Sequence, residues 1–142
     1  MIRPASAQDV PFIANLFMAS TSTAWDEKTI LEAISSSLYQ LFIWEEMDEV
    51  SGAVLCRRCA DEVEIINLAV LPAARRQGIG RALMRHVIAS LSMTEQLYLE
   101  VRSQNSAAIA LYKALNFVVI GRRRGYYAHP ADDAILMNFT KK

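Results

Sequence analysis

Two stretches of this chain carry groups that could do chemistry. In the first, RRQGIG, Gly78 and Gly80 stand beside Arg75 and Arg76 between an apolar run and a helix-like segment. Backbone N–H groups at the start of a helix bind anions, and glycines let a ligand approach the backbone closely. Arginine adds donors suited to phosphate. The loop therefore indicates a phosphate site, with an ordinary turn bearing solvated arginines as the alternative.

The spacing of this loop excludes two common nucleotide sites. A dinucleotide fingerprint needs Gly or Ala three positions after Gly80, where Leu83 stands. A P-loop needs Gly-Lys followed by Ser or Thr, and the chain has no Gly-Lys pair. Coenzyme A is the remaining common phosphate carrier held by a strand, a loop and a helix.

The second stretch, LEVRSQNSAAIALYKALNF, contains Glu100, Asn105 and Tyr112. On a helix, residues seven apart project within about 20° of each other, so the Asn105 amide and the Tyr112 phenol would form one ligand-contacting stripe. A half-buried helix with a surface tyrosine is the alternative. Strand alternation places Tyr98, Glu100 and Arg102 on one face, and Arg102 is the candidate partner of the Glu100 carboxylate.

The elements that must position these groups follow from hydrophobic periodicity. A strand at 2–3 precedes two helices, the second capped by Asp26. We expect strands over 40–46, 53–59, 63–71, 95–102, 117–124 and 133–140, a turn over 48–52, and helices over 78–91 and 105–115. The order βααβββαβαββ combines hairpins with a β-α-β crossover. It predicts an α/β (α+β) fold, with about seven strands in a mixed, mostly antiparallel sheet and about four helices.

Composition limits the classes of partner. The 142 residues fit one domain, 1–142, and 15 Lys and Arg balance 15 Asp and Glu, so the basic excess typical of nucleic-acid binding is missing. No stretch approaches the roughly 18 apolar residues of a membrane span. The N-terminus MIRPASAQDV lacks the apolar region of a secretory signal. We expect a cytoplasmic protein that binds neither nucleic acid nor membrane directly.

Cys56 and Cys59 form a C-x-x-C pair within an expected strand. Positions three apart on a strand face opposite sides, and a zinc site needs about four ligands. The chain has only two histidines, His86 and His129, to add. We therefore predict no metal site.

The segment RRQGIGRAL resembles the acetyl-coenzyme A motif of the GNAT N-acetyltransferases. Together with NLAV and LEVRSQNSAAIALYKALNF, it is similar to the bacterial ribosomal-protein-alanine N-acetyltransferases (RimI type) of that family. WDEKT at 25–29 and the pair Tyr126–Tyr127 extend the resemblance over nearly the whole chain. The chain departs from the family pattern at Ala24, Gly125 and Ala128, in the loops that the resemblance assigns to the acceptor side.

The resemblance implies a GNAT fold and acetyl-CoA as the acetyl donor. Glu100 would be the proton acceptor and Tyr112 the proton donor. The implied cofactor contacts are Leu68, Ala69, Val70, Arg76, Gln77, Gly78, Ile79, Gly80, Arg81 and Asn105.

The resemblance also implies the acceptor: the α-amine of an N-terminal alanine in a small-subunit ribosomal protein. An α-amine with a pKa of about 8 is roughly one-tenth neutral at pH 7, so a modest base suffices. Acetylation of a small-molecule amine or a lysine side chain is the alternative. A non-catalytic acyl-CoA-binding module is a third reading, against which the presence of Glu100 and Tyr112 weighs. We expect a monomer.

Overall fold

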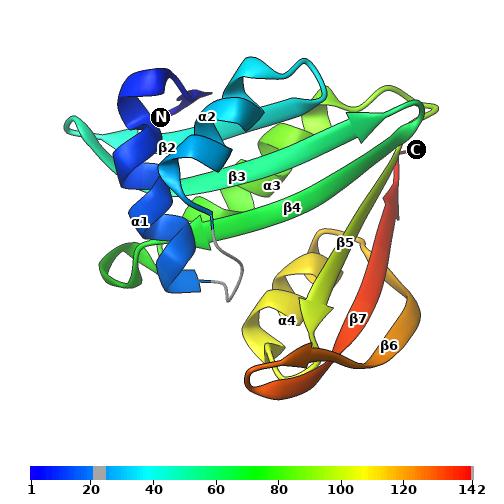
Figure 1. The fold of residues 1–142 in the computed structure, drawn as a ribbon. Coiled ribbons are helices and arrows are strands. Elements are labelled where there is room, and N and C mark those ends of the chain that lie inside the picture. The colour runs from blue at the N-terminus through cyan, green and yellow to red at the C-terminus, as the bar shows by residue number, and fades with distance from the viewer. Residues whose placement is uncertain (21–24, 142) are drawn as a thin grey trace.

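The computed structural model describes residues 1–20 and 25–141 (Figure 1), so Ala24 lies outside the described residues. The helices are α1 (Val10–Ser20), α2 (Glu27–Ser35), α3 (Ile79–Ser90) and α4 (Ser106–Ala114), with 3₁₀ turns at Ala7–Asp9 and Pro72–Ala74. The strands are β1 (Ile2–Pro4), β2 (Tyr39–Glu46), β3 (Glu49–Cys59), β4 (Glu62–Val70), β5 (Gln96–Arg102), β6 (Val118–Ala128) and β7 (Ala131–Thr140).

The strands form one seven-stranded sheet in the order β1-β2-β3-β4-β5-β7-β6. Every neighbouring pair is antiparallel except β4 and β5, which are parallel and are joined through α3. This arrangement confirms the predicted mixed, mostly antiparallel sheet and the predicted order of elements.

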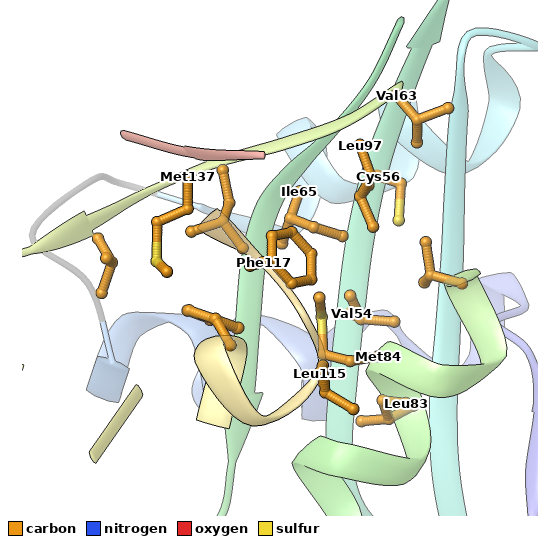
Figure 2. Packing of buried hydrophobic residues seen from close by; sticks show 14 of the residues in the cluster. Val54, Cys56, Val63, Ile65, Leu83, Met84, Leu97, Leu115, Phe117 and Met137 are labelled. Carbon is orange, nitrogen blue, oxygen red and sulfur yellow. The ribbon is translucent and has the colours of Figure 1, made fainter. Parts of the chain in front are cut away.

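Helices cover both faces of the sheet. One face packs Leu41, Ala53 and Leu55 against α1 and α2. The other packs Val54, Cys56 and Leu97 against α3 and α4, and Figure 2 shows part of this second cluster. Because β3 is buried on both sides, its centre reads as a continuous apolar run rather than an alternating one.

The two cysteines lie as the strand pattern predicts. Cys56 is buried and Cys59 is exposed, and both thiols are free. Asp26 caps α2 as expected, since its Oδ1 accepts a hydrogen bond from the Thr29 backbone N at 2.8 Å.

The turn predicted over 48–52 is in fact the two-residue turn Met47–Asp48, and β3 begins at Glu49. Both turn residues have positive φ, 51° and 63°. That geometry matches the twist of a tight hairpin but usually comes with Asn-Gly or Asp-Gly. Because neither sequence is present, the residue pattern predicts a turn that begins one residue too late.

Strands β4 and β5 pair over only three residues, Glu62 to Glu64 against Gln96 to Tyr98. Beyond that point they diverge (Figure 1). On the other side of β4, Cys56 pairs with Ile65 but Leu55 pairs with Asn67, so Ile66 is the extra residue of a β-bulge. The bulge lies next to the opening between the strands.

Candidate active site

A cleft of about 970 Å³ occupies the opening between β4 and β5. It brings together most of the residues that the sequence singles out: Leu68, Val70, Arg76, Gly78, Ile79, Gly80, Arg81, Glu100, Asn105 and Tyr112. Ala69 and Gln77 are not among the residues that line it, and the Ala69 side chain is buried on the face covered by α1 and α2.

The glycine loop forms one end of this cleft. Gly78 is the N-cap of α3 with φ 81°, Arg76 also has positive φ, and no side chain caps the helix. The first N–H groups of α3 therefore remain available to an anion. Arg76 and Arg81 are exposed beside them, and Arg75 Nε donates to the Val70 carbonyl at 3.3 Å.

Gly80 keeps the cleft open beside the loop. A Cβ added there would lie 3.7 to 4.0 Å from Leu111, Val70 and Leu68, all of which line the cleft. The position has no positive φ, so glycine is not needed there for backbone conformation. Its missing side chain leaves room for a ligand, and these residues fit the pyrophosphate and adjoining arm of coenzyme A.

Tyr112 lies on α4, on the face of the sheet that also carries α3. Its side chain is buried and its ring lies 5.7 Å from that of Phe117. Burial raises the pKa of Tyr112 to about 12. Among the described residues its hydroxyl has no hydrogen-bond partner. A neutral phenol with a free O–H can donate a proton to a ligand at neutral pH.

Glu100 faces the opposite side of the sheet, because its neighbours Leu99 and Val101 are buried in the cluster under α3 and α4. Its carboxylate Oε1 lies 3.3 Å from Arg123 Nε on β6. The predicted partner, Arg102, is engaged elsewhere: it donates to the Pro130 carbonyl at 2.8 Å. The prediction was wrong because the pairing depends on strand order: β7 pairs with both β5 and β6, which brings β6 within reach of Glu100.

Tyr127 is a cleft residue whose position the sequence did not reveal. It is half-buried, and Arg102 stacks over its ring at 4.1 Å. Burial and the negative charge of Glu100 raise its pKa, and Tyr127 in turn contributes to the raised pKa of Tyr112. Tyr127 therefore lies within electrostatic reach of both. The only sequence signal was the Tyr126–Tyr127 pair.

Asn105 contributes differently from the prediction. The helix α4 begins at Ser106, and Asn105 is its N-cap, with Oδ1 accepting from the Ala108 backbone N at 3.2 Å. The argument from one helix face therefore does not apply. Asn105 and Tyr112 both line the cleft nevertheless, and the cap leaves the Asn105 Nδ2 available to a ligand.

The described residues hold no group of three or more His, Cys, Asp or Glu side chains placed to bind a metal ion. Within the same part of the chain, no helix has both the length and the apolar character needed to cross a membrane.

The family model for the acetyltransferase (GNAT) family matches residues 10–117. The chain belongs to this family. It is thus an acetyl-CoA-dependent N-acetyltransferase, as the resemblance implied. The chain is 35% identical to the [ribosomal protein bS18]-alanine N-acetyltransferase of Escherichia coli, over 91% of this chain and 89% of that enzyme.

Solved structures of GNAT proteins share this fold. The crystal structure of the ribosomal-protein-S18-alanine N-acetyltransferase from Escherichia coli has a TM-score of 0.89 and 33% identity, over 99% of this chain and 92% of that one. A Salmonella typhimurium putative acetyltransferase, solved with acetyl-CoA, has a TM-score of 0.85 at 22% identity, over 99% of this chain and 92% of that one.

Proposed function

We propose that this GNAT enzyme transfers acetyl from acetyl-CoA to the α-amine of an N-terminal alanine in a small-subunit ribosomal protein. The choice of acceptor is supported by the near full-length similarity to the [ribosomal protein bS18]-alanine N-acetyltransferase. The chemistry is supported separately by the arrangement of the cleft, with an acid and a base on its two sides.

The side of the cleft with α3 and α4 would bind the donor. The N–H groups at the start of α3, with Arg76 and Arg81, would hold the pyrophosphate. The edge of β4 beyond Glu64 has no paired residue on β5, so its backbone groups from Leu68 to Val70 would pair with the pantetheine amides. Asn105 Nδ2 would add a donor farther along.

The opposite side of the cleft would receive the amine. Glu100, directly or through a water, accepts the proton that the ammonium must lose before its nitrogen can attack. The nitrogen then bonds to the acetyl carbonyl carbon, the carbon–sulfur bond breaks, and the nitrogen releases its second proton to solvent as the amide forms. Tyr112 donates its phenolic proton to the departing sulfur and regains a proton from solvent. The transfer is direct, and acetyl is never attached to the protein.

Intact-mass analysis of a synthetic peptide with a free N-terminal alanine tests this proposal. We expect a gain of one acetyl group with the enzyme and acetyl-CoA. The same peptide with a blocked α-amine and an internal lysine should gain none. Acetylation of the lysine peptide or of small amines, with the free alanine peptide unmodified, would contradict the proposed acceptor.

A further inference from the structure

Asn67 lies on β4 at the edge of the cleft, immediately after the bulged residue Ile66. Simple alternation would put Asn67 on the same face as Ile65, in the cluster under α3 and α4. The bulge reverses the alternation, because Asn67 pairs with Leu55, whose side chain is buried on the face under α1 and α2. The bulge therefore moves an amide from the apolar core to the acceptor side.

The amide nitrogen of Asn67 is unsatisfied. Its Nδ2 is buried and has no hydrogen-bond partner among the described residues. Buried polar groups in proteins are nearly always paired, because an unpaired donor loses its hydrogen bonds to water and gains nothing in return. A leucine would fill the same space at no such cost. The missing partner is therefore expected to come from a ligand in the cleft.

The ligand group must be a hydrogen-bond acceptor on the same side of the sheet as Glu100. Glu100 and Asn67 stand on the two strands that border the cleft, and both face away from the cluster under α3 and α4. A peptide bearing a reactive α-amine has a carbonyl oxygen two carbons from its nitrogen. A lysine side chain or a simple alkylamine has only methylene groups there.

We infer that Asn67 is a specificity-determining residue, whose Nδ2 donates a hydrogen bond to the carbonyl oxygen of the acceptor's first residue. The inference rests on the proposed function and deepens it. While Glu100 accepts the proton from the amine, Asn67 recognises the atom that distinguishes an α-amine of a peptide from other amines.

Two acceptor peptides separate this role from others. One begins with alanine and an ordinary peptide bond; the other replaces that first bond with a trans-alkene, which keeps its shape but has no carbonyl oxygen. We expect Asn67→Leu to lower kcat/KM for the ordinary peptide by about 10- to 100-fold and for the alkene peptide by less than about 3-fold. If Asn67→Leu folds poorly, Asn67→Asp takes its place, because aspartate has the same size but no N–H donor. It should show the same losses on the two peptides.

The matched control is Asn15→Leu, the same change at an exposed position of α1 outside the cleft, which should alter neither value. Equal losses on both peptides would overturn the inference, and a rise in the Kd for acetyl-CoA in the same variants would assign Asn67 to the donor instead. Failure of the wild-type enzyme to acetylate the ordinary peptide, with turnover of other amines, would overturn the proposed function and the inference together.

Discussion

Glu100 and Tyr112 lie on opposite faces of the sheet, and their surroundings differ accordingly. Tyr112 is buried beside Phe117, where a neutral phenol is favoured. Glu100 is exposed, and its Oε1 lies 3.3 Å from Arg123 Nε. A phenol on one side and a carboxylate on the other suit the proposed reaction, in which a proton leaves the amine and another reaches the sulfur.

We expect Tyr112→Phe to lower kcat by about 10²- to 10⁴-fold while the Kd for acetyl-CoA changes by less than about 2-fold. Phenylalanine fills the same buried space and removes only the hydroxyl. Steady-state kinetics and calorimetric titration with acetyl-CoA measure the two effects. A collapse of affinity with kcat preserved would make Tyr112 a binding residue.

Glu100→Gln should lose activity mainly at low pH. Below a pH of about 8 most of an α-amine is protonated and needs a base, whereas above it the neutral amine attacks unaided. A profile of kcat/KM from pH 6 to 9.5 tests this, with Glu62→Gln, an exposed carboxylate of β4 that does not line the cleft, as the matched control. A loss that is equal at every pH would indicate that Glu100 positions the acceptor.

Gly78 and Gly80 have different roles in the loop that begins α3. Gly78 adopts φ 81°, and a Cβ there would meet nothing within 4 Å. We expect Gly78→Ala to lower the free energy of unfolding by about 1–2 kcal/mol, the cost of a left-handed conformation for an L-residue. Urea unfolding measures it.

Gly80→Ala is the counterpart. Alanine favours a helix over glycine by about 1 kcal/mol, so the fold should be as stable or more so. Its methyl group, however, would lie among cleft residues and should raise the Kd for acetyl-CoA. Loss of stability in Gly80→Ala with unchanged affinity would contradict the role assigned to Gly80 in keeping the cleft open.

Asp9 ties the start of α1 to β1. Its carboxylate accepts two hydrogen bonds of 2.9 Å from Arg3 and one of 2.7 Å from the Ser6 backbone N. The hydrogen bonds from Arg3 are the main cause of the lowered pKa of Asp9. The ionised carboxylate therefore stabilises the fold above about pH 4, and this stabilisation is lost as the pH falls further.

Asp9→Asn should therefore lower the free energy of unfolding by about 2 kcal/mol at pH 7, and the difference from wild type should shrink toward pH 3. Urea unfolding at both pH values measures the change. A difference that persists at pH 3 would mean that the carboxylate charge is not what stabilises the helix start.

In the molecule as a whole, apolar side chains pack on both faces of one sheet, while two of its strands, β4 and β5, separate beyond three residue pairs.

Cys56 lies in the cluster under α3 and α4, and burial raises its pKa to about 12. The ordinary pKa of a cysteine thiol is near 9. The contribution of the neutral thiol to stability is therefore complete below pH 9 and is lost as the pH rises toward 12.

By pH 10.5 the wild-type chain should lose about 2 kcal/mol of unfolding free energy relative to Cys56→Val, which has no proton to lose. Urea unfolding of both chains at pH 8 and 10.5 gives the difference. Cys59→Val, at an exposed position, is the matched control and should follow the wild type. Parallel curves for wild type and Cys56→Val would show that the thiol is not what weakens the fold.

The order of helices and strands can be predicted from the sequence alone, because each element is encoded by local periodicity and caps such as Asp26. The family and ten of the residues that line the cleft can also be predicted, since the glycine loop and the segment from Glu100 to Tyr112 are each one continuous stretch of sequence. The position of the Met47–Asp48 turn could not be predicted, because its residues carry no local signal for a tight hairpin.

The way the cleft is completed cannot be predicted from local sequence. The separation of β4 from β5, the pairing of Glu100 with Arg123 and the approach of Tyr127 all depend on strands distant in the chain. The clearest case is Asn67, which alternation would place in the core with Ile65. One extra residue at Ile66 turns it toward the face under α1 and α2, because a β-bulge changes strand register without leaving a local sequence signal.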